Sequence, residues 1–487
     1  MRWIYGFALC GFLLMGIHGI HAQEQWGLKL GPSSGINGLA LNPASGLNSP
    51  YQMDVTFFSG HAFLETNYAF LRNSSILGLS SRVGTLTIID SPTFDKEPQA
   101  YPDAVVLDFF DDSRKRYLFG SAGATGLSAM FRLPGGHSLG WVARARYAMS
   151  GQNVPNNLSY LRYDRRPDLD PFPLHRWEMG LLAWSELGLH YGHQWETATG
   201  TFNAGLTAKY LMGYEGSYFE NSDDLDAYTK ITGDTIAAEK MDLRYGYTRT
   251  NLGAPPLQIS QNGAGWGLDL GVEWTQDGDM DPYQWKIGVA LLDIGAIRFS
   301  KNAAQHHAVS SKPVVLPNGD YDFVDSPEDL DEIARLFSYQ TLGDSTASFV
   351  GDQFTLWMPT AISVQAEYGV LPNLWIHGAL VQRIPHPGIS IERGNSILFA
   401  PRFERRWVAA GLPVTLYNWE QVRVGLFLRV GPLVLGTDHF PAYFVPGKLS
   451  GGDFYISIHW PFNLSFKGAS TNRFVKLKKG SVKCYTF

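Results

Sequence analysis

The sequence predicts an all-β protein, a transmembrane antiparallel up-and-down β-barrel. Six stretches alternate apolar and polar residues for roughly seven to eleven positions; one of them sets Leu139 and Trp141 on one parity against Arg144 and Arg146 on the other. Successive side chains of a strand face opposite sides, so each stretch predicts one apolar face and one small or polar face. A soluble β-sandwich has the same period, so alternation alone does not decide between the two folds.

The length of the stretches and their ends favour the barrel. The longest stretches run to about ten residues, which span the hydrocarbon layer when tilted, whereas strands in soluble sheets cluster near five or six. Aromatic rings also lie near the predicted strand ends, where they suit the two headgroup levels. These aromatic residues are Trp141, Tyr147, Tyr191, Trp195, Tyr210, Tyr214, Trp266, Trp274, Tyr283, Trp285, Trp407, Tyr417 and Trp460.

Residues 1–22 have the pattern of a secretory signal peptide. Arg2 precedes an apolar core at residues 7–17, and Ile20-His21-Ala22 predicts cleavage after Ala22. Elsewhere the sequence holds no run of roughly 18 uncharged apolar residues, so membrane residence requires strands. Cleavage leaves Cys484 as the one cysteine, which excludes an intramolecular disulfide framework.

Composition narrows the function classes. The net charge of −6 gives no basic surface for nucleic acid, so we expect no nucleic-acid partner. The mean hydropathy of −0.12 resembles that of a soluble protein. Barrels are expected to look this way because their inward residues dilute the apolar outward ones.

Turn lengths predict the topology. Short turns at residues 133–136, 196–200, 276–279 and 371–373 have turn chemistry and are expected at the periplasmic rim. Residues 155–177, 215–262 and 301–354 are then long loops at the outer rim. The strand signals between about Tyr51 and Phe462 predict about 14 strands, within a range of 12 to 16.

Two of the long segments are acidic. One contains Glu215, Glu220, Asp223, Asp224 and Asp226. In the other, residues 326–337 predict a short helix, with Ser326 as N-cap and Pro327 at the first position. An ordinary packed loop helix is the favoured interpretation, and a helix that caps or plugs the barrel mouth is the alternative.

The C-terminal region allows two readings of the closing strand. We predict that residues 454–462 close the barrel, which then covers residues 51–464, and that residues 465–487 form a basic periplasmic tail. The alternative makes residues 480–487 the last strand, because an aromatic C-terminus is typical of assembled barrels. Lys483 breaks the apolar parity there and favours the tail.

The sequence offers no persuasive catalytic, metal or cofactor site, so we predict a protein without enzymatic activity. It has no nucleophile elbow, phosphate-binding loop or Cys-x-x-Cys pair. The charged residues on the inward parity are more informative, because a lipid-facing Arg or Lys costs about 2 to 4 kcal/mol near the bilayer midplane. We expect them to pair with one another inside the barrel; the alternative is that they line a substrate path. They are Arg144, Arg146, Lys209, Asp269, Glu273, Arg423 and Arg429, with Glu186 and Glu367.

An ordered set of motifs over about residues 35–461 resembles an uncharacterised family of Gram-negative outer-membrane β-barrels with a domain of unknown function. The motifs are Asn42-Pro43-Ala44, Asn67-Tyr68, residues 184–189, 208–214, 265–271, 292–295, 401–404 and 431–438. Asn42-Pro43-Ala44 is also similar to an element of the outer-membrane long-chain fatty-acid transporters and of type IX secretion barrels. Read by itself, the tripeptide is equally a turn in which Asn42 bonds nearby backbone and Pro43 fixes φ.

The resemblance implies a barrel in the cell outer membrane and two functions. The first is transport of hydrophobic or amphipathic small molecules; the second is a non-enzymatic docking barrel for a secretion or surface-assembly complex. We expect residues 23–50 to form a plug or latch around Asn42, Pro43 and Ala44. The expected partners are outer-membrane lipid and either a hydrophobic ligand or a secretion or surface protein, with no cofactor.

Overall fold

A computed structural model describes residues 24–82, 84–221, 225–233, 235–249, 260–280, 282–317 and 330–462 of the chain. The expected signal peptide, the first turn of the expected helix at residues 326–329 and the expected C-terminal tail lie outside these residues.

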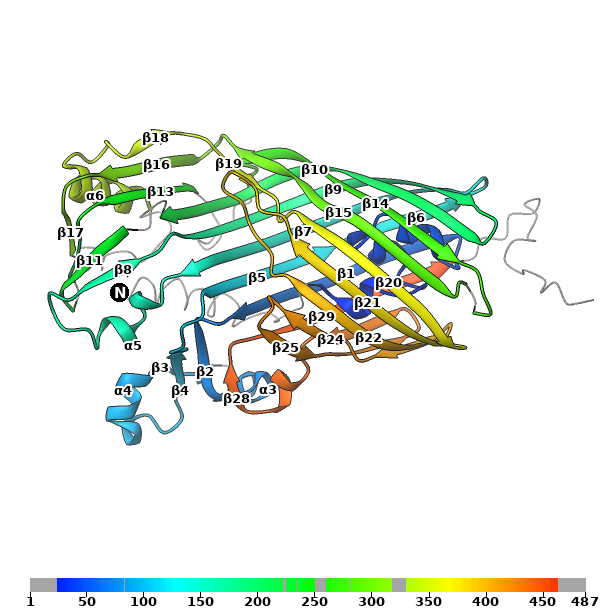
Figure 1. The fold of residues 1–487 in the computed structure, drawn as a ribbon, viewed down its shortest axis with the longest axis horizontal. Helices are drawn as coiled ribbons and strands as arrows, with labels where there is room; N and C mark the ends of the chain where they lie inside the picture. The colour runs from blue at the N-terminus through cyan, green and yellow to red at the C-terminus, as the bar shows by residue number, and fades with distance from the viewer. Residues whose placement is uncertain are drawn as a thin grey trace, which may run out of the picture.

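The described residues form a closed antiparallel barrel of 14 strands, as the sequence predicted (Figure 1). Several wall strands are interrupted and so bear two labels. In chain order the wall consists of β1 (Met53–Thr66), β5 (Arg116–Thr125) with β6 (Ser128–Leu133), β7 (His137–Val154), β9 (Trp177–Glu196), β10 (Gly200–Asn221), β14 (Gly263–Gln276), β15 (Trp285–Phe299), β19 (Phe354–Trp357) with β20 (Ala361–Leu371), β21 (Leu374–Arg383), β22 (Ser396–Glu404), β23 (Val408–Gly411) with β24 (Val414–Tyr417), β25 (Gln421–Val424) with β26 (Leu426–Val430), β27 (Leu433–Thr437) and β29 (Gly451–Phe462).

The barrel closes between β29 and β1, where Trp460 lies opposite Val55 and Phe454 opposite Ala62. This register confirms residues 454–462 as the closing strand; the alternative at residues 480–487 lies outside the described residues. The four predicted short turns all lie at one rim, which we call the short-turn rim. The connection between β24 and β25 is also short but lies at the opposite rim, so the wall is low there.

The prediction of strands of about ten residues is wrong for the longest ones. β7, β9 and β10 have 18, 20 and 22 residues. Glu215 was expected to begin a loop, but β10 continues through it to Asn221. The alternation ends earlier than the strand because only the part of the wall in contact with lipid requires an apolar outer face.

The three predicted long loops are also largely folded, which corrects their description as loops. We call this folded region the cap; it stands on the rim opposite the short turns (Figure 1). β13 (Met241–Thr248) pairs with β10 and with β16 (Ala303–Ser310), which also pairs with β18 (Phe349–Gly351). A second sheet has the order β17 (Val314–Pro317), β12 (Thr235–Ala238), β11 (Leu225–Thr232) and β8 (Pro171–Leu174), and α5 (Tyr160–Tyr163) lies between β7 and β8 in the chain.

The predicted helix is present as α6 (Leu330–Leu342), five residues longer at its C-terminal end than predicted. It packs against the cap: Tyr247 Oη donates to Asp331 Oδ1 at 2.7 Å, and Arg249 Nε donates to Asp331 Oδ2 at 2.7 Å. This packing is that of a loop helix held on the cap.

A third sheet lies beside the same rim (Figure 1). It has the order β28 (Gly447–Leu449), β2 (Ala69–Ser74), β4 (Val105–Phe109) and β3 (Ile88–Asp90), with the short helices α3 (Ile76–Ser80), α4 (Ser91–Lys96) and α7 (Pro441–Phe444). Arg72 joins this sheet internally through Asp108 and Asp95, at 2.7 and 2.9 Å.

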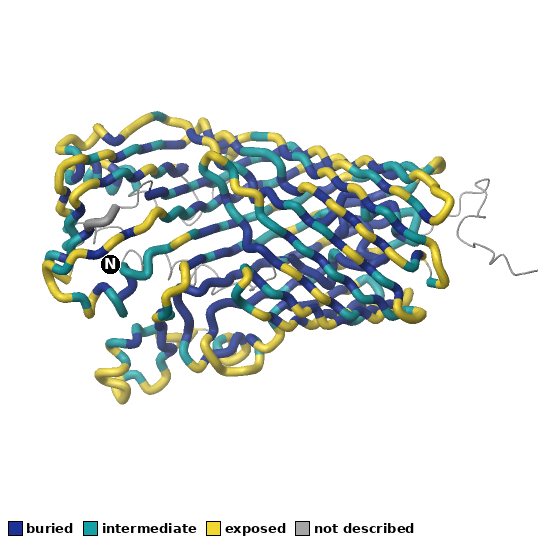
Figure 2. Tube along the Cα trace, in the orientation of Figure 1, coloured by how far each residue is buried: buried dark blue, intermediate teal, exposed yellow. Residues whose placement is uncertain are grey.

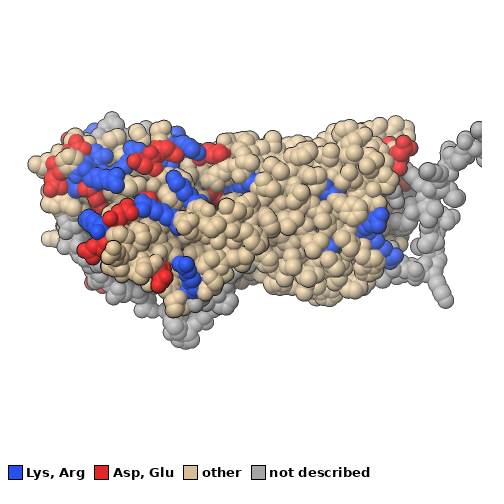
Figure 3. All heavy atoms as spheres, turned by 90° about the horizontal axis from the view of Figure 1, so that it is seen from below, with Lys and Arg blue, Asp and Glu red and all other residues tan. Residues whose placement is uncertain are grey.

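The outer surface carries a broad band with few charged side chains, and charges gather on the cap (Figure 3). Buried and exposed residues alternate along the wall strands (Figure 2). Large exposed aromatics mark the short-turn rim: Trp195, Trp285, Trp407 and Trp460. Tyr283 and Tyr417 were expected among such rings, but both are buried. In the described part of the chain, no helix is long and apolar enough to cross a membrane.

Candidate functional site

Residues 24–50, which we call the N-terminal segment, lie inside the barrel near the short-turn rim (Figure 1). The segment folds as α2 (Trp26–Lys29) and two 3-10 turns, η1 (Gly35–Ala40) and η2 (Ser45–Asn48). Its apolar side chains pack against the inner wall: Trp26 and Leu41 against β20 to β22, and Leu28 against Phe427 and Tyr455. On the opposite side, Ile36 packs against Met130 and Val142. The segment therefore contacts strands around most of the circumference.

Asn42 anchors this segment to two wall strands. Its Nδ2 donates to the Val272 carbonyl oxygen of β14 at 3.1 Å and to Gln365 Oε1 of β20 at 2.9 Å. Its Oδ1 accepts from the Ala44 N–H at 2.9 Å, which is the local turn that the sequence allowed as an alternative. Asn42 thus forms the turn and holds the segment to the wall at the same time.

Wall glycines make room for Asn42, Pro43 and Ala44. A Cβ at Gly205 would overlap the carbonyl oxygen of Pro43, and one at Gly271 would overlap Asn42 Oδ1. Because the close neighbour at Gly205 is backbone, the segment could not accommodate a side chain there without moving. Gly205 of β10 and Gly271 of β14 thus form part of the seat of the N-terminal segment.

The charged residues predicted on the inward parity lie inside the barrel in ion pairs. Arg144 and Arg146 share Glu186, at 3.1 and 3.2 Å, and Lys209 contacts Asp269 at 2.7 Å. The remaining pairs join Glu273 and Glu367 to Lys286, Arg423 to Glu65, and Arg429 to Glu404. Charged groups in a low-dielectric interior are stable only when they are paired, which explains this arrangement.

Asp293 joins the first network but was missed from the sequence. It contacts Arg146 at 2.8 Å and Lys209 at 2.7 Å. Even-numbered residues of β15 face inward up to Leu292. A bulge opposite Asp269 then lets Asp293 and the odd-numbered Ile297 and Phe299 face inward. Asp293 has a positive φ of 53°, and the change of parity hides it from a strict period of two.

An internal chamber lies between the N-terminal segment and this network. It contains about 900 Å³ of empty space, part of it open to solvent. The N-terminal segment contributes Gln25, Lys29 and Asn37, and the wall contributes Arg144 and Asp293. The loop between β21 and β22 folds inward and adds Glu392 and Arg393. The chamber therefore has a mostly polar and charged lining.

Lys29 is the chamber cation without an ion pair among the described residues. Arg144, Arg146 and Lys209 contact acids as given above, and Arg393 contacts Glu24 at 2.7 Å. Burial lowers the pKa of Lys29 to about 8; Glu24 opposes this shift, and Arg393, Arg144 and Arg146 add to it. Lys29 was not singled out from the sequence because the N-terminal segment has no periodic pattern.

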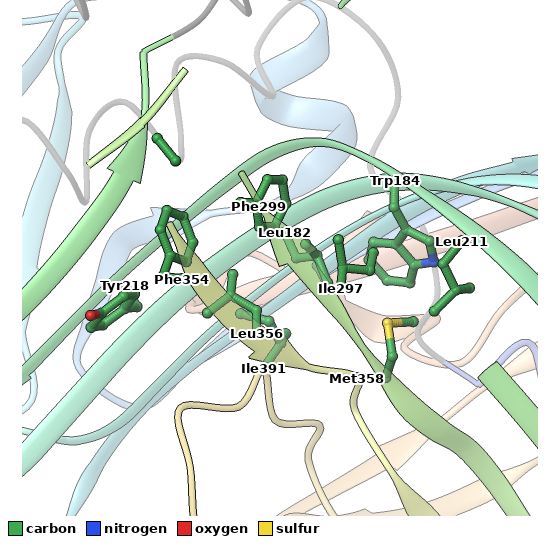
Figure 4. Packing of buried hydrophobic residues seen from close by; sticks show 12 residues of the cluster. Leu182, Trp184, Leu211, Tyr218, Ile297, Phe299, Phe354, Leu356, Met358 and Ile391 are labelled. Atoms are coloured by element: carbon green, nitrogen blue, oxygen red, sulfur yellow. The ribbon is translucent and has the colours of Figure 1, made fainter. Parts of the chain in front are cut away.

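An apolar cluster adjoins the chamber at Trp184, which belongs to both. Figure 4 shows its side chains. Leu182 and Trp184 from β9, Leu211 and Tyr218 from β10, Ile297 and Phe299 from β15, and Phe354 and Leu356 from β19 form it with Met358 and Ile391. The inward loop is held by the Glu392 N–H, which donates to Ser150 Oγ at 3.0 Å. Along its axis the barrel thus contains an apolar layer, a charged chamber and the N-terminal segment.

A closed barrel with an apolar outer band and an internal N-terminal segment is a membrane β-barrel. The model of a family of unknown function, DUF5723, matches residues 67–438, and the chain belongs to this family. No curated protein matches the chain.

Solved structures similar to the chain include three from bacteria. The Pseudomonas putida toluene transporter TodX has a TM-score of 0.36 and 9% identity, with 88% of this chain and 95% of that chain covered. The Ralstonia pickettii toluene transporter TbuX has a TM-score of 0.29 and 10% identity, with 88% of this chain and 95% of that chain covered. A Pseudomonas aeruginosa FadL homologue has a TM-score of 0.21 and 9% identity, with 87% of this chain and 93% of that chain covered. At these TM-scores the likeness carries no argument about what this chain binds.

Proposed function

We propose that the protein is an outer-membrane conduit, without a catalytic step, for hydrophobic or amphipathic small molecules. The observation that carries this proposal is the layered interior: a partly open chamber with a charged lining lies between an apolar cluster and the N-terminal segment. Outer-membrane lipid is then the medium of the barrel, and an amphipathic molecule is its ligand.

The layered interior suits a molecule with an apolar body and a polar or anionic end. The apolar cluster offers contacts for the body, while Lys29 and Arg144 line the chamber below it. Both cations can donate to a carboxylate, and Lys29 has no acid of its own among the described residues. The inward charges thus act partly as a paired network and partly as a polar lining.

Passage through the barrel requires the N-terminal segment to move. Residues 35–50 occupy the interior between the chamber and the short-turn rim, so in the proposed mechanism they act as a latch held by Asn42. Other bonds to the wall have to break with those of Asn42: Asn48 Nδ2 donates to Glu273 Oε2 at 2.7 Å, and the Ile36 N–H donates to Asp54 Oδ1 at 3.1 Å.

A docking barrel for a secretion or surface-assembly complex is the second candidate, and the cap favours it. The edge strand β18 and helix α6 expose Phe349, Val350 and Tyr339, with exposed fractions of 48, 61 and 61%. Exposed apolar side chains grouped on a folded surface are typical of protein-binding sites. In this case the chamber would play no part in the function.

The test compares the full chain with a variant that lacks residues 23–47. Both are refolded into liposomes, barrel folding is checked by heat-modifiable gel mobility, and conductance and hydrophobic-dye flux are measured against empty liposomes. We expect the deletion to increase flux. Equal flux in two correctly folded barrels would refute the latch, and silence of both would favour the docking barrel.

A further inference from the structure

α7 connects the apolar band of the wall with the third sheet. The Phe440 N–H, just before α7, donates to the Val424 carbonyl oxygen of β25 at 2.8 Å. Val424 belongs to a row of exposed apolar side chains on β25 and β26, which also contains Val422, Leu426, Leu428 and Val430. Because an apolar outward row of a membrane barrel faces lipid, α7 lies directly beside lipid-facing wall.

Residues 440–446 form an exposed segment without a charged side chain. Their sequence is Phe-Pro-Ala-Tyr-Phe-Val-Pro, and five of these seven residues are exposed. Phe444 and Val445 are 57% and 62% exposed, and the ring centroids of Phe440 and Phe444 lie 4.9 Å apart. Ala442 and Tyr443 instead pack into the core of the third sheet. The segment therefore has one face toward the protein and one apolar face that the described residues leave uncovered.

α3 extends this apolar face. Ile76 of α3 and Ala442 of α7 belong to the same buried cluster, and the next residue, Leu77, is exposed. Residues 75–81 also contain no charged side chain. Figure 1 shows that α3 lies nearer the short-turn rim than α4, which carries the exposed Asp95. The third sheet thus has its uncharged helix on the side of the apolar band and its charged helix on the far side.

An exposed cation follows each of these two apolar elements in the chain. Arg82 comes shortly after α3, and Lys448 comes shortly after α7. Among the described residues, neither cation has an ion-pair partner. The Lys448 ammonium lies over the Phe70 ring, 4.7 Å from its centroid, so the side chain runs along apolar surface. Exposed apolar side chains next to unpaired cations are typical of segments that lie in a membrane interface, where the cations meet lipid phosphates.

We propose that residues 440–446 and α3 form a membrane anchor, which lies at the acyl-chain boundary of the leaflet on the cap side. Its exposed apolar side chains contact acyl chains, while Lys448 and Arg82 reach lipid phosphate groups. Lipid is the occupant of this face because the face continues the lipid-facing row of β25 and because the anchor itself contains no acid. The third sheet is thereby held against the membrane surface. The proposal is independent of what the barrel transports.

The test places a nitroxide spin label on Phe444→Cys in the full chain, with Cys10→Ser and Cys484→Ser so that the label has one site. The labelled barrel is refolded into vesicles of phosphatidylcholine and phosphatidylglycerol, and folding is checked by heat-modifiable gel mobility. Collision rates of the label with dioxygen and with a water-soluble nickel chelate are then measured. Dioxygen is concentrated among the acyl chains and the chelate in water, so the ratio of the two rates reports the surroundings of the label.

Two further labelled positions calibrate this ratio. Val424→Cys gives the value for lipid-facing wall, and Tyr339→Cys, at an exposed position of α6 in the cap, gives the value for water. We expect the ratio at residue 444 to lie within about twofold of the Val424 value and at least about fivefold above the Tyr339 value, because an interfacial anchor is buried about 5 to 10 Å into the headgroup and acyl boundary.

A second variant tests whether the apolar side chains hold the third sheet at the membrane. Phe444→Asp with Val445→Asp is combined with a label on Leu77→Cys in α3. We expect the ratio at residue 77 to fall at least about threefold, because acidic side chains resist transfer from water into the acyl region. The matched control changes the same pair of residue types in the cap, Phe349→Asp with Val350→Asp, and should leave the ratio at residue 77 unchanged.

Three outcomes would overturn the proposal. A label at residue 444 that gives the Tyr339 ratio would place the segment in water. Low collision rates with both reagents would show that protein, such as a second copy of the chain, covers the segment. An unchanged ratio at residue 77 in the folded double variant would show that the apolar side chains do not act as an anchor. If the double variant does not fold, the label at residue 444 decides.

Discussion

The substitution Asn42→Ala tests whether a few hydrogen bonds hold the N-terminal segment in place. Asn42 is 1% exposed and makes three hydrogen bonds, two from Nδ2 to Val272 and Gln365 and one from the Ala44 N–H to Oδ1. Alanine removes all three and leaves their partners inside the barrel. Pro43 and the seat formed by the wall glycines stay unchanged.

The size of the expected loss in free energy follows from the buried hydrogen-bond partners that Asn42→Ala leaves unsatisfied. An unsatisfied buried polar group costs about 1 to 3 kcal/mol, and Gln365 keeps a second hydrogen bond, from its Nε2 to the Leu41 carbonyl oxygen at 3.2 Å. We therefore expect the seated segment to lose about 2 to 4 kcal/mol relative to an unseated one. Because about 1.4 kcal/mol changes an equilibrium tenfold, the unseated population rises roughly 30-fold to 1,000-fold.

Backbone hydrogen exchange of the solubilised barrel measures this population. Exchange in η1 and η2 is expected to accelerate by that factor, while exchange in β10 stays the same. Asn157→Ala is the matched control, because it removes a hydrogen bond to the Pro173 carbonyl oxygen at the opposite rim. If exchange in η1 and η2 were unchanged in a correctly folded Asn42→Ala barrel, packing alone would hold the segment and the reasoning would be wrong.

Three further predictions concern the chamber, the seat and the cap. Lys29→Met is expected to lower the flux of an anionic amphipath into liposomes about tenfold at pH 7, because it removes a charged donor, and to leave the flux of a neutral dye unchanged. In the wild type, flux of the anion should fall as the pH rises through about 8, the lowered pKa at which Lys29 loses its charge. Gly205→Ala is expected to unseat the N-terminal segment, seen as faster exchange in η1 and η2, whereas Gly378→Ala, whose new Cβ has no neighbour closer than 3.8 Å, should not. Asp331→Asn is expected to weaken the docking of α6 by up to about 1 kcal/mol, measured as faster hydrogen exchange in that helix. Burial would raise the pKa of Asp331, but hydrogen bonds from Tyr247 and Arg249 outweigh it and lower the pKa. The stabilisation of α6 by Asp331 should therefore be present above pH 3.8 and be lost as the pH falls below it.

The sequence predicted the barrel because lipid imposes one strict rule on its outer face. Alternation identified the inward residues Arg144, Lys209 and Arg423, since a charged side chain on the lipid face is costly. The same rule explains the aromatic residues at the short-turn rim. Tyr417 shows its limit: an aromatic ring near a strand end can also turn inward, and here it stacks on Arg423.

Other parts of the site have no periodic signal. A bulge reverses the parity of β15, so Asp293 joins the chamber network from a position that alternation assigns to lipid. The strands β8, β12 and β17 of the cap pack against a small apolar cluster that includes Phe172 and Val314, but each has four residues, which is too short for alternation to identify it. Lys29 lies in a segment without regular structure, and only the three-dimensional arrangement shows that it faces the chamber without an acid of its own.

β10 connects the two ends of the molecule as a single strand. Its 22 residues extend roughly 70 Å at about 3.3 Å per residue. With the usual strand tilt of about 40°, this length spans roughly 50 Å along the barrel axis, which is about twice the height of a typical apolar band of about 25 Å. At one end Gly205 touches the N-terminal segment, and at the other Ser217 to Asn221 pair with the cap. This strand therefore joins the seat of the N-terminal segment to the cap through one continuous hydrogen-bonded backbone, with a single bulge between Gly213 and Glu215.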